Sequence, residues 1–569
     1  MIKKFVKRVF NTETSKHLWL AAIFSVLLIS IVQARTIESV IPGDSLVYLK
    51  LQNLKECREA IEHSENWKEA AGIISAAPQW QPTNQFMQML PMFTGTDIQG
   101  LIETFLEGQI AVTVSPGAQG LMVGIVIENS GTLQQAEQIL FQLTGTLSGM
   151  AGNPVQPEEG DYQGITYHTA QLNTLQLTYG SINETLLLVG ITPGSFEKMV
   201  DTYKAEEKAI TESTAYRAAA DKFGKSEVFA FVNVEIGSPY LKAILPSVVG
   251  AQLDAFQTLT YSWDLLQPGG TQQLSGTLKN DTQGTLISLF QEPPKMQAIQ
   301  GLSGDEEFFL TTSPSSSQIL YQTILGSEND TSLSNENLIS FLIPDQTNLL
   351  ETVTGELVIS ADLSLGTILE QEEPKFATQL TNGEIDGFKA EFPEMDLGVI
   401  FNPTSPAKWQ TFFNGFLEKL STELPRQFDY KGKTFNTASI PGTLYYGNVN
   451  KLFVLAFSKE KYQSIVDNLL DENLTPLFKE KLERLPANPA CLFQLNLEKF
   501  LPLVETEGIP WWRPEIVAFT QKIGVMFASF AVGEDMASLE LTLSHEEKPI
   551  NAVARLAPII FFVTTLNQQ

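Results

Sequence analysis

Apolar and polar residues alternate along several short stretches of this chain, a pattern typical of β-strands that bury one face. The clearest stretches are residues 45–51, 227–235 and 491–498, and a helical spacing of apolar residues follows each of them. A weaker copy at 304–313 precedes a helical pattern at 317–325. We therefore predict four units in which a strand leads directly into a helix.

Two further pairs of strand-like runs predict hairpins, residues 108–115 with 121–128 and residues 355–361 with 397–401. Hairpins join antiparallel strands, whereas the strands of a doubly wound parallel sheet would be apolar throughout. The predicted fold class is therefore α+β, with antiparallel-rich sheets and helices packed on one face.

A long stretch of sequence occurs twice. Residues 179–201 read YGSINETLLLVGITPGSFEKMVD, and residues 446–467 read YGNVNKLFVLAFSKEKYQSIVD. The first tyrosines are 267 residues apart and the last aspartates are 266 apart, while Gly304 follows Gly43 by 261. These offsets predict two tandem duplicated halves, residues 35–300 and 301–569. Two large domains also suit 569 residues, since one core serves at most roughly 250–300.

The first 34 residues have the pattern of an export signal. Five basic side chains precede or border an uninterrupted apolar run at 18–32, and Ala34 follows at a position suited to a signal peptidase. Cleavage after Ala34 is the prediction. The alternative is an uncleaved anchor formed by residues 18–34, which lies at the short end of the length needed to span a bilayer. In both cases the body of the protein is exported, periplasmic or extracellular.

The charge is strongly acidic. The net charge is −28, and the part after the leader carries −32 because the leader has five basic residues and one acid. Such a surface repels phosphate backbones, so no nucleic-acid partner is expected. Hydrophobic residues make up 43% and charged residues 18%, as in folded chains.

Three Ser-x-x-Lys sequences are the only match to nucleophilic chemistry, in which the lysine takes the proton of the serine. They begin at Ser195, Ser405 and Ser458, and each lies where a helix is expected to start. Serine at such a position commonly caps the helix. The chain lacks the Gly-x-x-x-x-Gly-Lys phosphate loop and the Gly-x-Ser-x-Gly elbow. No catalytic or cofactor-binding residue is assigned.

Metal ligation has little support. The histidines after the leader are isolated, and the acidic groups at 158–161 and 305–307 lack the ligand spacing of a calcium loop. We interpret both acidic groups as solvated surface charge, and no metal site is assigned. Cys57 and Cys491 are too few for a disulfide framework. Two buried free thiols are favoured, and a bridge between them stays an alternative.

Two aromatic or apolar segments remain. Residues 511–514, Trp-Trp-Arg-Pro, could form a binding lip, although packing between elements is favoured. The C-terminal run at 556–566 is too short to cross a membrane and is expected to be buried.

The turn Pro42-Gly43-Asp44, with the strand and helix that follow it, resembles an uncharacterised family of exported bacterial proteins known only as a domain of unknown function. Members of that family open with a Pro-x-Asp strand after a signal or anchor. The fourth strand-helix unit departs from the pattern, having Ser303 in place of the proline. The resemblance implies export and supplies no active-site residues.

The favoured interpretation is an exported, non-enzymatic envelope protein that binds or scaffolds, with an envelope protein or an apolar ligand as its candidate partner. One alternative is an exported serine hydrolase of the Ser-Lys type. A second alternative is a carrier of apolar ligands, suggested by the apolar alternations and the C-terminal run. Membrane contact is expected only through the N-terminal segment, if it stays uncleaved.

Overall fold

The computed structural model divides the chain into two compact units. Unit 1 comprises Met1–Thr277 with Ser544–Gln569, and unit 2 comprises Leu278–Leu543. The structure describes residues 37–105, 107–118, 120–129, 133–150, 156–172, 175–244, 250, 253–279, 296–304, 306–312, 356–362, 396–403, 405–420, 425–440, 442–471, 489–501, 514–533, 535–543 and 548–566.

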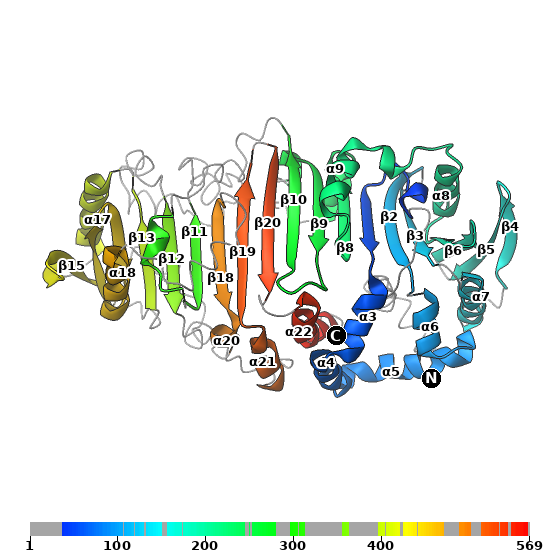
Figure 1. Ribbon diagram of the computed structural model, residues 1–569, viewed down its shortest axis with the longest axis horizontal. Coiled ribbons are helices and arrows are strands. Elements are labelled where there is room, and N and C mark those ends of the chain that lie inside the picture. The colour runs from blue at the N-terminus through cyan, green and yellow to red at the C-terminus, as the bar shows by residue number, and fades with distance from the viewer. Residues whose placement is uncertain are drawn as a thin grey trace, which may run out of the picture. The chain divides into compact units, whose positions relative to one another are not determined.

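Unit 1 is built on a sheet whose strands lie in the order β4-β5-β6-β7-β3-β2-β1-β8-β9-β10 (Figure 1). Neighbours from β4 to β9 are antiparallel. The strands are β1 (Val47–Leu51), β2 (Gln109–Gly117), β3 (Gly120–Glu128), β4 (Glu158–Tyr162), β5 (Ile165–Leu172), β6 (Leu175–Ser181), β7 (Leu186–Gly190), β8 (Val228–Asn233), β9 (Phe256–Trp263) and β10 (Thr271–Leu278).

Helices cover both faces of this sheet. The α-helices of unit 1 are α3 (Leu54–His63), α4 (Glu65–Ser75), α5 (Gln81–Thr94), α6 (Ile98–Phe105), α7 (Leu133–Met150), α8 (Ser195–Tyr203), α9 (Thr214–Phe223), α10 (Val234–Ile244) and α22 (Pro549–Leu566). The 3-10 turns are η1 (Ile37–Val40), η2 (Pro78–Trp80), η3 (Ile210–Glu212) and η4 (Leu253–Ala255). One core joins η1, α8 and α9 to the sheet, and another joins α3, α6 and α7 to its other face (Figure 1).

Strand β7 shows why two faces are covered. Leu186 and Leu188 belong to the core under α8, whereas Leu187 and Val189 belong to the core under α7. Every residue of this strand is buried. A strand that alternates between two apolar cores has no polar face, which the run LLLVG already indicates.

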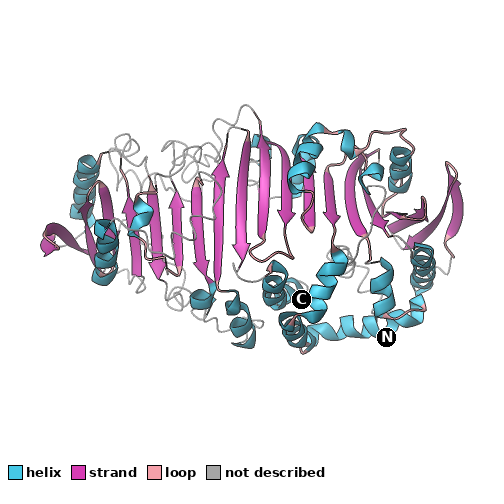
Figure 2. Cartoon of the chain, viewed as in Figure 1, coloured by secondary structure: helices cyan, strands magenta, loops and turns pink. Residues whose placement is uncertain are grey.

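Unit 2 has the sheet order β14-β15-β16-β17-β13-β12-β11-β18-β19-β20, with all these neighbours antiparallel. Figure 2 shows its strands and helices. The strands are β11 (Phe308–Thr312), β12 (Leu357–Asp362), β13 (Asp396–Phe401), β14 (Arg426–Tyr430), β15 (Lys433–Ile440), β16 (Gly442–Val449), β17 (Leu452–Ala456), β18 (Cys491–Asn496), β19 (Val525–Val532) and β20 (Met536–Leu543). The helices and 3-10 turns are α17 (Pro406–Leu420), α18 (Lys459–Asp471), α20 (Leu497–Phe500), α21 (Pro514–Thr520), η6 (Ala298–Gly301) and η8 (Gln521–Ile523).

Both faces of the unit 2 sheet are also covered. One core packs α18 and η6 on the sheet, and a second packs α17 on the opposite side of β16 and β17. Helix α18 lies so close to β13 that a Cβ at Gly398 would come within 2.6 Å of the Cδ1 of Ile465.

The α+β class and the antiparallel sheets are confirmed, and both expected hairpins form. The expectation that helices pack on one face is wrong, because strands such as β7 and β17 are apolar throughout and bury two faces. Strand for strand, the two units have the same order from edge to edge. Duplication is a statement about ancestry, and it stays a prediction.

The unit boundaries differ from the expected division at residue 300, and the C-terminal helix belongs with unit 1. Helix α22 packs on α4, where the indole N–H of Trp67 donates to the carbonyl of Ile550 at 3.0 Å. The Ser64 hydroxyl donates to the Asn551 side-chain oxygen at 2.8 Å. These contacts span more than 480 positions, so no local pattern in the sequence predicts them.

Candidate functional site

The Ser-x-x-Lys sequences all lie at helix starts, as expected. Ser195 begins α8, Ser458 precedes α18, and Ser405 precedes α17. Lys408, the lysine that belongs with Ser405, is exposed in the first turn of α17. The side chains of the other two lysines are only 11% (Lys198) and 9% (Lys461) exposed, so those two copies are the candidates for chemistry.

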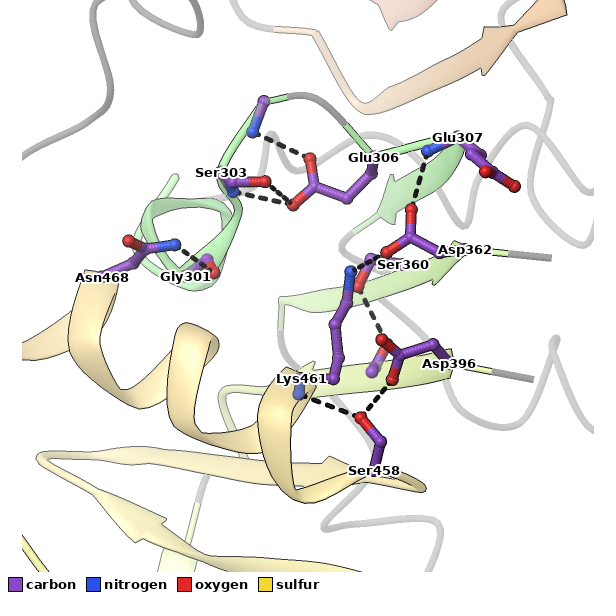
Figure 3. Close-up of polar contacts among 12 residues, drawn as sticks. Gly301, Ser303, Glu306, Glu307, Ser360, Asp362, Asp396, Ser458, Lys461 and Asn468 are labelled. Carbon is purple, nitrogen blue, oxygen red and sulfur yellow. Dashed lines mark hydrogen bonds and ion pairs between the residues drawn. The ribbon is translucent and has the colours of Figure 1, made fainter. Parts of the chain in front are cut away.

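In unit 2 the serine and the lysine have different partners (Figure 3). The Ser458 Oγ accepts the backbone N–H of Lys461 at 2.9 Å, which caps α18, and its hydroxyl donates to the Asp396 carboxylate. The Lys461 Nζ instead forms an ion pair with Asp362 Oδ2 at 2.8 Å. The lysine side chain is only 9% exposed.

Asp362 makes a second contact that extends the cluster to another strand. Its Oδ1 accepts the backbone N–H of Glu307 at 3.1 Å, just before β11 (Figure 3). The cluster thus ties the start of α18 to the end of β12 and, through Ser458, to the start of β13.

The adjacent Glu306 stabilises the turn before β11 through hydrogen bonds to its carboxylate. Its carboxylate accepts the backbone N–H of Ser303 at 2.7 Å, the Ser303 hydroxyl at 2.8 Å and the backbone N–H of Gly304 at 2.8 Å. Glu306 is 3% exposed. The interpretation of this residue as solvated surface charge is therefore wrong, because three hydrogen bonds replace its water.

Unit 1 repeats the arrangement with other partners. The Ser195 hydroxyl donates to the carbonyl of Thr192 at 2.6 Å, and the serine is buried. The Lys198 Nζ pairs with Asp44 Oδ2 at 2.6 Å and also donates to the carbonyl of Pro116, near the end of β2, at 3.0 Å. Lysine at this position therefore ties a helix start to strand ends in both units.

A second contact recurs in the two units. The Tyr162 hydroxyl donates to Asp201 at 2.9 Å in unit 1, and the Tyr430 hydroxyl donates to Asp467 at 2.9 Å in unit 2. In each case the tyrosine ends the edge strand of the sheet and the aspartate lies on the helix. The hydrogen bond to Asp201 raises the pKa of the Tyr162 hydroxyl.

These contacts decide what the clusters can do chemically. A Ser-Lys nucleophile needs a neutral amine that faces the serine hydroxyl and takes its proton. Here each ammonium faces a carboxylate, and each hydroxyl donates elsewhere. The arrangement is suited to fastening a helix to a sheet by an ion pair and a cap.

The partner carboxylates were not singled out from the sequence. In the sequence Asp44 belongs to the turn Pro42-Gly43-Asp44, and Asp396 directly precedes the strand predicted at 397–401. An aspartate at the boundary of a strand is the signal that could have found them. It is weak, because aspartate is common in turns.

The side chains of metal-ligating type are dispersed. Among the residues that the structure describes, no group of three or more His, Cys, Asp or Glu side chains could hold a metal ion. Glu158 and Glu159 are exposed on the edge strand β4. His168 lies 3.9 Å from Glu137 and packs on Phe141, while His545 is outside the described residues.

Both cysteines are free thiols; Cys57 is buried, as expected, whereas Cys491 is only partly buried. Cys57 lies on α3 in unit 1, and Cys491 begins β18 in unit 2. Burial, aided by Glu227 and Glu56, raises the pKa of the Cys57 thiol to about 12, and burial raises that of Cys491 to about 11. Thiols held protonated at neutral pH are weak nucleophiles and weak ligands.

The remaining expectations concern two apolar segments. The Trp511-Trp512-Arg513 part of the aromatic cluster lies outside the described residues. The C-terminal run belongs to α22, in which Pro558 is buried and Ile560 is 54% exposed. No helix in the described part of the chain is long and apolar enough to cross a membrane.

Comparisons with known proteins add little. No family model matches the chain, and no curated protein matches it. Three crystal forms of the protein TP0453 are similar over 43–44% of this chain and 81–82% of their own, at 11–12% identity. Their TM-scores are 0.23–0.25.

Proposed function

We propose that this protein is an exported, non-enzymatic component of the cell envelope with a binding or scaffolding role. The observation that carries the proposal is the leader, in which basic residues and the apolar run at 18–32 precede Ala34. The opening turn Pro42-Gly43-Asp44 supports kinship with the exported family named above.

The contacts of the Ser-x-x-Lys sequences favour a scaffold over the hydrolase alternative. Lys461 and Lys198 are engaged as cations by Asp362 and Asp44, and neither serine hydroxyl is directed to its lysine amine. Within each unit the sheet buries apolar side chains on both faces, which supplies a packed scaffold on which loops can bind a partner.

Cell fractionation of a C-terminally tagged chain tests the proposed export. We expect the product to be shorter than the precursor by the leader and to leave the membrane in a salt wash. A full-length product retained in the membrane after the wash would favour the anchor formed by residues 18–34, and a cytoplasmic product would contradict export altogether.

A serine-reactive fluorophosphonate probe tests the alternative that the protein is a serine hydrolase. We expect no labelling above that of the Ser195→Ala/Ser458→Ala double variant. Labelling that disappears on either single substitution would establish the hydrolase instead. Lipid in an organic extract of the purified protein would favour the carrier.

A further inference from the structure

The first described residues of unit 1 form a short buried segment, which we call the entry plug (residues 37–41). Ile37, Val40 and Ile41 are each 0% exposed. All three belong to the core that α8 and α9 share with the sheet. The folded core of unit 1 therefore begins within a few residues of the predicted cleavage site.

A buried ionic contact also holds the entry plug. Glu38 is 9% exposed, and its Oε1 lies 3.1 Å from the Lys50 Nζ. The hydroxyls of Tyr48 and Tyr216 donate to the same oxygen at 3.2 and 3.4 Å. Withdrawing the plug would leave Lys50, which is 7% exposed, without its counterion, and an unpaired buried charge is strongly unfavourable.

Backbone hydrogen bonds join the plug and the turn that follows it to a distant part of the chain. The N–H of Ile210 donates to the carbonyl of Ile41 at 2.8 Å, and the N–H of Gly43 donates to the carbonyl of Lys208 at 2.7 Å. The partners lie more than 160 positions away, so these bonds form only when unit 1 has folded.

The predicted scissile bond, Ala34–Arg35, lies very close to this plug. Ile37 follows Ala34 by three residues, which span at most about 10 Å when fully extended. A peptidase must hold a stretch of chain on both sides of the bond in its cleft. With Ile37 in the core, only Arg35 and Thr36 separate the predicted scissile bond from the folded unit. We therefore expect cleavage after folding to depend on opening of the plug, at a rate that follows the population of the open form.

We propose that the entry plug protects the leader from removal once unit 1 has folded, so that the leader must be removed before unit 1 folds. This inference rests on the proposed cleaved leader. Water adds to the Ala34 carbonyl, the C–N bond to Arg35 breaks, and the products are the Ala34 carboxylate and a new amino terminus on Arg35. A chain whose unit 1 folds first keeps residues 18–34 and stays attached to the membrane through them.

An order-of-addition experiment with the full-length precursor tests the proposal. The precursor is diluted from urea into mild detergent either together with a purified signal peptidase or after refolding, which tryptophan fluorescence follows. We expect cleavage of the refolded precursor to be about 100-fold slower or more, because only the open form is cut.

A linker variant serves as the control. Inserting about ten Gly and Ser residues between Thr36 and Ile37 leaves the plug intact and adds about 35 Å of reach. After refolding, this variant is expected to be cut as fast as the unfolded precursor. Equal rates for the refolded and unfolded wild type, or continued protection of the linker variant, would overturn the proposal. Failure of the peptidase in both orders would instead refute the cleaved leader, and this inference with it.

Discussion

Lys461 and Lys198 have the same role in the two units although their partners differ. Each extends from the first turn of a helix to an aspartate at the boundary of a strand, at 2.8 and 2.6 Å. Because both lysine side chains are about one-tenth exposed, loss of either amine leaves the aspartate without its cation and the site less well packed.

We predict that Lys461→Met destabilises unit 2 by about 1–2 kcal/mol, since a hydrogen bond to a charged group is lost while Asp362 keeps partial access to water. Hydrogen exchange of the α18 amides, measured with and without the substitution, checks this. Lys459→Met on the same helix removes an exposed charge and is expected to change stability by less than about 0.5 kcal/mol. Equal effects of the two substitutions would contradict the role of the ion pair.

Glu356 is a buried acid whose titration affects stability. It is 3% exposed at the start of β12, and its Oε2 accepts the N–H of Gln297 at 2.9 Å. Burial raises its pKa above the usual 4.5, and the backbone N–H groups of residues 296–299 oppose that shift. The folded state therefore binds more protons than the unfolded state between 4.5 and the raised pKa, so this group lowers stability as pH rises through that window.

Glu356→Gln should remove that pH dependence, because the amide is always neutral and keeps an acceptor oxygen for Gln297. Thermal unfolding of the variant and the wild type between pH 5 and pH 8 measures it. We expect the midpoint of the variant to rise relative to that of the wild type as pH increases. A difference that stays constant over this range would show that the Glu356 carboxyl does not titrate differently on folding.

Helix α22 shows how an element acquires its place from contacts rather than from pattern. Ile550 is 3% exposed in a small core with Cys57 and Leu265, while Ile560, ten residues later, is 54% exposed. The helix packs against α4 and α3, and Ile560 is the one exposed side chain among residues 549–561.

We predict that Ile550→Ala destabilises unit 1 by about 2–4 kcal/mol, through lost burial and the cavity left behind. Limited proteolysis within residues 549–566 should accelerate as α22 loosens. Ile560→Ala, on the exposed part of the same helix, is the matched control and should change stability by less than about 0.5 kcal/mol. Unchanged proteolysis in Ile550→Ala would mean that other contacts hold the helix.

Each unit of the molecule contains one cysteine, and both thiols are protected in the same way. Burial raises the thiol pKa to about 12 for Cys57 and about 11 for Cys491, so little thiolate exists near neutral pH. The native protein is expected to react slowly with a disulfide reagent at pH 8, and two thiols should appear when denaturant is added. Rapid native labelling of one thiol, or a missing thiol after unfolding, would contradict protected free cysteines in both units.

Much of the architecture could be predicted from the sequence. The hairpins, three of the four strand-helix units and the antiparallel sheets follow from alternation over a few residues, which is a local property. The helix expected at residues 317–325 lies outside the described residues. The number of covered faces was missed, although β7 and β17 are apolar at nearly every position. Packing from both sides explains such runs, since each face of the strand then needs apolar side chains.

The candidate site also has a part that the sequence predicts and a part that it does not. The sequence placed Ser195 and Ser458 at helix starts, where capping is a local interaction. It did not predict Asp44, Asp362 or Asp396 as partners, since a carboxylate becomes a partner only when the strand order places its strand end beside the helix. The buried Glu38 contact with Lys50 is of the same kind.

The sequence by itself determined the elements, the acidic character and the repeated stretch at residues 179 and 446, because these depend on residue type and short-range order. The tertiary structure decided which residues of that stretch matter. Tyr179 and Tyr446 are both 0% exposed in the sheets, and Lys198 and Lys461 pair with aspartates from distant strands. A serine and a lysine one helical turn apart can form a catalytic pair, or they can cap a helix and pair it with a strand, according to which residues lie beside them. Only the assembled sheet supplies those neighbours.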